Sequence, residues 1–427
     1  MLARCKLSQR TIASSKLLYR TAFTLMVSIA LIAGCEPEKT SNSQKMNVLA
    51  PVDGMGSNFG KSETGNEAIS EVQALELAVR WVKAIETKNE IQMELFFDWN
   101  GVVDRSIQGM NLSDDFVRMY KKGAKQKLMA GILESLSLQL EGGGSYSLVR
   151  IVQRSGAQHA VFRLVGKDRS INYHDLQISR FGNSIRADRY FIASTGEELA
   201  DTLRTLVGPA LLGQASFAAR ITGRDKKALD GVEKQSKMMN AAKLGHLDEA
   251  KRLYNLLPVP QKYSKASMLT LIMATDVSDQ EAYLLAIDNY VKRFPNDPAV
   301  GIHTLGAGIL RNDPDLVEKS RKCVQDWTGG DEFLDLFVGE ALANMGKVEE
   351  AIKLTQNIEP DSLQLAVAHD FKLSIALAAK DYPRVLRELM ALRDEYDCTL
   401  DDLRKAEGFE GFVSSPEFGK WVGQDDI

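Results

Sequence analysis

The sequence has few of the residues that build disulfide scaffolds and metal centres, with four cysteines and five histidines among 427 residues. Three of the histidines, His246, His303 and His369, stand singly in helical segments, so no ligand pair for zinc is predicted. A phosphate-binding glycine loop, a dinucleotide fingerprint, an HExxH segment and a nucleophile elbow are also missing. We therefore predict no catalytic residue, no metal and no cofactor, and favour a role other than catalysis.

Long apolar runs and an excess of basic charge are lacking as well. After residue 34, no stretch of the sequence is long and apolar enough to cross a bilayer. The chain has 53 Lys and Arg against 57 Asp and Glu, a formal net charge of −4, and removal of five basic residues with segment 1–34 would leave (53 − 5) − 57 = −9. Nucleic acid is not an expected partner, because its phosphates require a basic surface.

The first 34 residues have the order of an export signal. Five basic residues precede an apolar run over 21–33, which is too short for a stable transmembrane helix. The run closes on LIAGC, residues 31–35, which resembles the lipobox of bacterial lipoproteins. The resemblance implies cleavage between Gly34 and Cys35, and acylation of Cys35 with more than one chain, so that the membrane is a partner through lipid.

The segment after the lipobox indicates in which membrane the protein is anchored and how far its folded body can stand from that membrane. Glu36 stands where, in lipoproteins, an aspartate often marks retention in the inner membrane, so the resemblance favours an outer-membrane anchor facing the periplasm. Residues 35–68 are rich in Ser, Asn, Gly, Lys and Pro and have no apolar period. This composition predicts a flexible tether of roughly thirty residues that separates a folded body from the membrane.

Residues 69–207 change from helical to strand-like periodicity. Leu75, Ala78, Val82 and Ile85 follow the spacing of an amphipathic helix, and helical patterns continue, with a possible break at Gly123, up to three consecutive glycines at 142–144. The four strand-like runs that follow cover 146–153, 159–165, 171–180 and 184–192. Glycine-containing turns separate these runs, so an antiparallel meander behind a helical layer is predicted, and the class is α+β.

The order of helices followed by four strands is similar to that of the NTF2-like, or cystatin-like, superfamily. The resemblance implies a curved sheet that wraps a helix into a cone, and in some members an Asp, His or Tyr inside it. Here His174 and Asp188 are the candidates for such a pocket. The alternative is a satisfied core or edge histidine and a cross-strand ion pair of Asp188 with an arginine, which we favour because nothing specifies a complete catalytic set.

The C-terminal half repeats itself. The segments KLGHLDEA at 243–250 and NMGKVEEA at 344–351 align at an offset of about three 34-residue periods. Val317 and Val385 each lie 34 residues from Ala351. A further copy near Ala282 is out of phase by one or two residues.

These positions resemble the tetratricopeptide consensus, in which small residues let paired helices approach closely. The resemblance implies four to five helical hairpins over 229–400, a linker or connecting helix at 208–228 and a capping segment at 401–427. The residues that it assigns to packing between helices are Gly245, Ala250, Val317, Gly339, Gly346, Ala351 and Val385. An irregular helical bundle is the alternative.

The predicted function is that of an envelope lipoprotein whose helical array binds a protein segment or supports an assembly. Binding of a small hydrophobic molecule in the α+β cone is the alternative, followed by an isomerisation there. Cys323 and Cys398 lie on separate predicted helices, so we expect buried free thiols rather than a disulfide.

Overall fold

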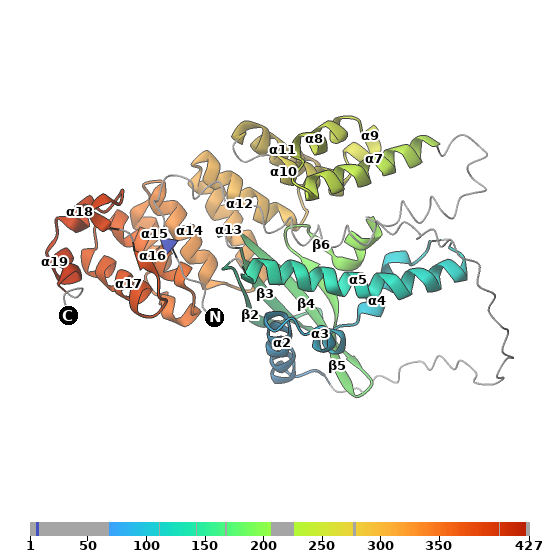
Figure 1. Ribbon diagram of the computed structural model, residues 1–427, viewed down its shortest axis with the longest axis horizontal. Helices are drawn as coiled ribbons and strands as arrows, with labels where there is room; N and C mark the ends of the chain where they lie inside the picture. The colour runs from blue at the N-terminus through green and yellow to red at the C-terminus, as the bar shows by residue number, and fades with distance from the viewer. Residues whose placement is uncertain are drawn as a thin grey trace, which may run out of the picture.

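The computed structural model places an α+β half beside a helical half (Figure 1). The ranges that the structure describes are 6–7, 68–110, 112–141, 143–166, 169–205, 226–275, 279–400 and 402–423. Gly34, Cys35 and nearly all of the predicted tether lie outside them. Within these ranges, no helix combines the length and the apolar character needed to cross a bilayer.

In the described part of the chain, four helices precede the sheet. They are α2 (Glu71–Glu86), α3 (Glu90–Phe96), α4 (Trp99–Ile107) and α5 (Asp114–Glu141). Ser70 begins α2 through a capping box with Gln73. The predicted break at Gly123 is wrong, since α5 continues through it. A single glycine costs a helix only about 1 kcal/mol, and the burial of Leu128 and Ile132 on the same helix offsets that cost.

The sheet is antiparallel throughout, with the strand order β2-β3-β4-β5-β6. The strands are β2 (Ser145–Arg154), β3 (Ala157–Val165), β4 (Ile171–Phe181), β5 (Ser184–Ile192) and β6 (Glu197–Glu198). The four predicted runs correspond to β2 to β5. The sheet nevertheless has five strands rather than four, because β6 is only two residues long and too short to show an alternating pattern.

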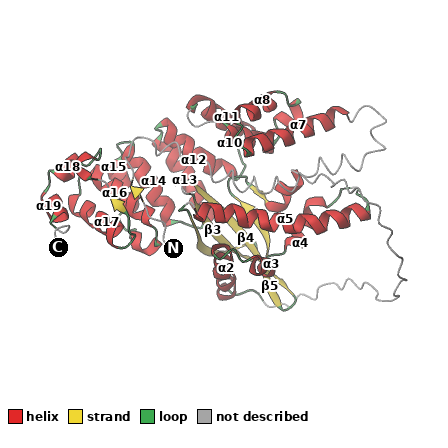
Figure 2. Ribbon diagram, viewed as in Figure 1, coloured by secondary structure: helices red, strands yellow, loops and turns green. Residues whose placement is uncertain are grey.

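Both faces of the sheet are covered. Phe162, Leu176 and Tyr190 point to one face and share a core with helices α2 to α5. Val161 and Tyr173 point to the other face, where they pack with side chains of the helical half. Figure 2 shows the strands between α5 and the helices α12 and α13. The two halves therefore share a hydrophobic core at their contact, in addition to the cores that each half has of its own.

Buried ion pairs reinforce this contact, which we call the seam. Arg163 of β3 lies 2.5 Å from Oδ1 of Asp331, and both side chains are almost completely buried. The Tyr173 hydroxyl donates to Oδ2 of Asp331 over 2.8 Å. At a second point of the seam, Arg169 lies 2.7 Å from Glu340. Each carboxylate thus meets a cation or a donor, as burial of charge requires.

The helical half is a series of paired helices. The members are α7 (Lys226–Lys243), α8 (Leu247–Asn255), α9 (Val259–Lys262), α10 (Lys265–Ala274), α11 (Gln280–Arg293), α12 (Ala299–Arg311), α13 (Pro314–Thr328), α14 (Glu332–Asn344), α15 (Val348–Thr355), the 3-10 helix η3 (Pro360–Leu363), α16 (Ala366–Ala379) and α17 (Tyr382–Asp394). The pairs α7–α8, α12–α13, α14–α15 and α16–α17 pack most closely. We call this series the helical array.

The turns within these pairs recur at the predicted interval. Asn312, Gly346 and Lys380 each adopt a positive φ, of 55°, 79° and 57°, and follow one another every 34 residues. Gly245 makes the equivalent turn between α7 and α8 with a φ of 75°. A left-handed residue after a helix ends it and lets the chain reverse. The repeat visible in the sequence is therefore present as a repeated turn.

Five of the seven residues assigned to packing lie between helices, whereas the assignment is wrong for Gly245 and Gly346, which are exposed in turns where a Cβ would meet no atom within 4 Å. Ala250, Val317, Ala351 and Val385 are fully buried, one in the second helix of each close pair. A Cβ on Gly339 would lie 2.5 Å from Cγ2 of Thr355, so the side chain must be absent for α14 and α15 to approach.

Short elements close the C-terminal end of the array. They are β7 (Thr399–Leu400), η4 (Leu403–Lys405), α18 (Glu410–Val413) and α19 (Pro416–Val422). Phe409, Phe412 and Trp421 share a core with α16 and α17. A two-residue strand, β1 (Lys6–Leu7), pairs in parallel with β7 and lies inside the predicted signal peptide, so cleavage there would remove it.

The two cysteines in the helical half are both free. Cys398 is buried, as predicted, whereas the prediction that Cys323 is buried is wrong. On α13 the buried stripe runs through Val317, Ser320 and Val324. Cys323 stands beside that stripe and is left exposed to solvent.

Candidate functional site

His174 lies in the packed core rather than beside open space. Its Nδ1 is 2.8 Å from the hydroxyl of Tyr190 and 3.3 Å from that of Tyr146. The Tyr146 hydroxyl also accepts a hydrogen bond from the Trp81 indole over 3.4 Å. Burial lowers the pKa of His174 to about 3, so the ring is neutral at physiological pH. These contacts fit a structural histidine with satisfied partners.

Asp188 lies on β5, whereas His174 lies on the neighbouring strand β4. A bulge in the pairing of β4 with β5 places Asp188 outside the regular register, between Ala187 and Arg189. Partial burial raises the pKa of the Asp188 carboxyl, while the nearby charge of Arg105 opposes that rise. Among the described residues, no hydrogen bond or ion pair joins His174 to Asp188. The structure therefore does not bring the two candidates together.

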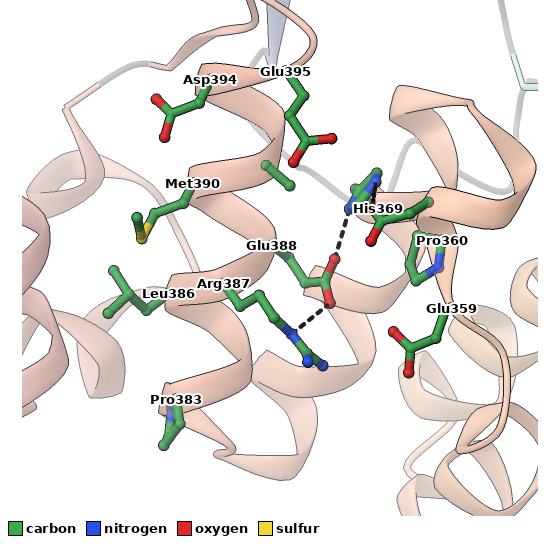
Figure 3. A pocket seen from close by; sticks show the side chains of 12 residues that line it. Glu359, Pro360, His369, Pro383, Leu386, Arg387, Glu388, Met390, Asp394 and Glu395 are labelled. Carbon is green, nitrogen blue, oxygen red and sulfur yellow. Dashed lines mark hydrogen bonds and ion pairs between the residues drawn. The ribbon is translucent and has the colours of Figure 1, made fainter.

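A cleft of about 450 Å³ opens in the last part of the helical array, between η3, the first turns of α16, and α17 (Figure 3). We call it the η3–α17 cleft. Its lining side chains are Glu359, Pro360, Asp361, His369, Pro383, Leu386, Arg387, Glu388, Met390, Ala391, Asp394 and Glu395. None of them is a serine, threonine or cysteine, so the lining offers no hydroxyl or thiol nucleophile.

Local sequence explains how the cleft is built. The residues that α17 contributes recur at helical spacing along one face, from Pro383 through Leu386 and Met390 to Asp394. Asp381 begins this helix by accepting a hydrogen bond from the backbone of Arg384 over 3.2 Å. On the opposite side, η3 begins at Pro360 and ends at Gln364, whose φ of 51° turns the chain into α16.

A buried carboxylate forms the floor of the cleft. Glu388 is only 2% exposed, and its Oε2 accepts from Nδ1 of His369 over 2.8 Å. Its Oε1 accepts from Nε of Arg384 and lies 3.8 Å from Nε of Arg387. Figure 3 shows Glu388 directed from α17 toward His369. Two arginines and a histidine thus surround this buried carboxylate, as burial of a charge requires.

The second nitrogen of His369 faces the cleft without a hydrogen bond. The side chain is 3% exposed, and Nε2 lies 3.1 Å from Oδ1 of Asp361 without the geometry of a hydrogen bond. Because an ionised Glu388 can only accept, Nδ1 of His369 must carry a proton. When the ring is neutral, Nε2 is then an acceptor, and it lies beside a second acceptor, Oδ1 of Asp361. A hydrogen-bond donor placed between these two atoms would satisfy both.

Lys372 lies behind the cleft and does not line it. Its ammonium group donates to the backbone carbonyl of Thr355. Burial lowers the pKa of this lysine to about 8, and the charge of Arg384 contributes in the same direction.

Sequence reasoning missed this site. It treated His369 as isolated, since no ligand or acid stands near it along the chain. The partner Glu388 lies 19 residues away and meets His369 only because α16 and α17 form a hairpin. The available signal for this contact was the alignment of hairpins, which places residues 369 and 388 on neighbouring helices. Among the described residues, no group of His, Cys, Asp and Glu could hold a metal ion.

Comparisons with known proteins give no relative for the chain. No protein-family model matches it, and neither a curated protein nor a solved structure is similar to it. The cleft and the predicted export signal are therefore the features from which a function is inferred.

Proposed function

We propose that the protein is an envelope lipoprotein, anchored through acyl chains on Cys35, that binds a partner protein through a tetratricopeptide-like helical array. One observation carries the proposal, which is the open η3–α17 cleft in the last part of the array. The predicted tether of residues 35–68 would let this cleft reach a partner away from the membrane surface. The outer membrane, facing the periplasm, is the proposed location.

The repeated turns support the array as the binding element. Stacked helical hairpins bury their small residues between neighbours and leave a surface for ligands. Asn312, Gly346 and Lys380 mark this repeat, and the cleft lies at the last of its close pairs, α16 and α17. The array ends in a cap of aromatic residues, so its final hairpin is protected from solvent without covering the cleft.

Packing in the α+β half disfavours the alternative of a small hydrophobic ligand. A ligand in an NTF2-like cone would need space next to His174. The side chains around this histidine include Tyr146, Phe162 and Tyr190, all almost completely buried in one core. The opposite face of the sheet is occupied by the helical array. We propose that this NTF2-like half positions the array.

Site-specific photocrosslinking in intact cells tests the proposal. Benzoylphenylalanine in place of Met390 puts a reactive group in the cleft, and the same residue in place of Leu285 or Phe181 puts it on exposed sites elsewhere. We expect a discrete protein adduct from position 390 that the two control positions do not give. Absence of an adduct at 390, or the same adducts from all three positions, would contradict the proposal.

A further inference from the structure

We propose that the η3–α17 cleft binds a cationic side chain, arginine in preference to lysine, presented by the partner protein. The positive group would lie between Asp361, Glu395 and Nε2 of His369. This inference rests on the proposed function, since it names the chemistry that the partner must offer.

The unsatisfied nitrogen of His369 is the first reason. Nε2 has no hydrogen-bond partner and lies only 3.1 Å from an oxygen of Asp361, and it presents a lone pair there when the ring is neutral with its proton on Nδ1, toward Glu388. Two neighbouring acceptors, one of them a carboxylate, are best satisfied by N–H groups that carry positive charge. The side chain of His369 is 97% buried, as its 3% exposure shows, so solvent has little access to it.

The balance of charge around the cleft is the second reason. Several lining acids already have cationic partners, because Glu388 meets Arg384, Glu359 lies 3.5 Å from the same arginine, and Asp394 lies 2.6 Å from Arg393. Among the described residues, no lysine or arginine forms an ion pair with Asp361 or Glu395. These two acids therefore remain available to a cation from outside.

The wall of the cleft selects among cations. Pro360, next to His369, gives it an apolar surface on which a side-chain stem can lie. A bare metal ion would leave this surface unused, and an anion would be repelled by the available acids. A guanidinium group carries five donors in one plane and can reach two or three acceptors at once, whereas an ammonium group concentrates its charge at one point. Arginine is accordingly the better fit.

A pair of probe peptides tests this inference with the lipid-anchored full chain in detergent. The first is a fluorescein-labelled Gly-Leu-Arg-Leu-Gly peptide, and the second has citrulline, which has the same shape but no charge, in place of arginine. We expect fluorescence anisotropy to show binding of the arginine peptide at least about tenfold tighter, because a charge-assisted hydrogen bond contributes about 1.5–3 kcal/mol. Equal binding of the two peptides would overturn the inference.

Three variants locate the binding. Asp361→Asn and Glu395→Gln remove a charge in the cleft, and each should weaken the arginine peptide about tenfold. Glu349→Gln removes an equally exposed charge from α15, outside the cleft, and should leave the affinity unchanged. Loss of affinity in Glu349→Gln equal to that in the cleft variants would indicate nonspecific attraction and overturn the inference.

The outcomes also separate this inference from the proposed function. Arginine-selective binding without a photoadduct at position 390 would support the inference about arginine and contradict the proposal that the cleft binds an envelope protein. A specific photoadduct combined with equal binding of the arginine and citrulline peptides would contradict only the chemistry assigned to the partner.

Discussion

Two buried histidines make the stability of the fold depend on pH. Burial lowers the pKa of His174 to about 3 and that of His303 to about 4. Nε2 of His303 lies 2.9 Å from the carbonyl oxygen of Ser194, so this nitrogen carries the proton of the neutral ring. Both rings bind fewer protons in the folded chain than in the unfolded chain. Stability is therefore lost as the pH falls below about 6.5, the ordinary pKa of histidine, toward the folded values.

This linkage predicts the behaviour of a substitution at His174. Between pH 7.5 and pH 5, His174 alone should lower the free energy of unfolding by about 2 kcal/mol. His174→Gln removes the titrating group, so the variant should lose about 2 kcal/mol less than the wild type over that interval. Urea unfolding at the two pH values measures the difference. The exposed His246→Gln is the control and should behave like the wild type.

Acylation of a single cysteine decides the proposed location. The signal and lipobox predict that Cys35 receives the lipid, so wild-type cells fed labelled palmitate should yield a labelled protein. Cys35→Ala should remove the label and leave an unprocessed or released chain, whereas Cys323→Ala should keep it. Lack of label in the wild type would show that the anchor assignment is wrong.

At the scale of helices and strands, close approach explains which glycines matter. A Cβ on Gly339 would also lie 3.1 Å from Cδ1 of Ile375, so it would press on two helices at once. Thr355 cannot easily move aside, because it is β-branched and its hydroxyl donates to the carbonyl of Ala351 over 2.8 Å. A Cβ on Gly123 of α5 would meet no atom within 4 Å. The two glycines should therefore respond to substitution in opposite ways.

Gly339→Ala should lower the free energy of unfolding by about 1–3 kcal/mol, because it overpacks the contact between α14, α15 and α16. Gly123→Ala should raise it by up to about 1 kcal/mol, because alanine is the better helix former. Thermal and urea unfolding followed by circular dichroism measure both changes. An unchanged stability in Gly339→Ala would mean that these helices are farther apart than described.

Local patterns were sufficient for most elements, and long-range contacts were not visible in them. The predicted run 184–192 coincides with β5, because alternation and a glycine turn at Gly182 are encoded in neighbouring residues. The 34-residue interval likewise predicted where the turns at Gly346 and Lys380 fall. By contrast, the pairing of His369 with Glu388 depends on how separate helices meet, and no period in the sequence encodes it.

At the scale of the whole molecule, the seam makes the two halves one body. Asp331 lies where α14 begins, and it accepts from Arg163 and Tyr173 of the sheet and from the backbone of Phe333. The guanidinium of Arg163 also lies 4.3 Å from the centre of the Phe333 ring. A sequence-based division into 69–207 and 229–400 describes the order of the chain, whereas the shared core means that neither half buries all of its apolar surface alone.

Loss of one seam carboxylate should therefore weaken the whole fold. Asp331→Ala leaves Arg163 buried without its partner and should lower the free energy of unfolding by about 3–5 kcal/mol. Asp335→Ala removes a carboxylate that is 22% exposed and pairs with Arg321, and it should cost only about 1–2 kcal/mol. Calorimetry compares the two variants. Equal costs would show that the seam contributes no more than a surface ion pair.

The η3–α17 cleft, and not the sheet, is the proposed binding site of the partner protein. Titration calorimetry with the partner identified by crosslinking tests this site most directly. Three proteins are compared: the wild type, the double variant Asp361→Asn/Glu395→Gln, and the control Glu349→Gln. Because all three altered side chains are exposed, the melting temperature should stay nearly constant. We predict an affinity at least about tenfold weaker for the double variant and unchanged for Glu349→Gln. Wild-type affinity in the double variant would contradict the account.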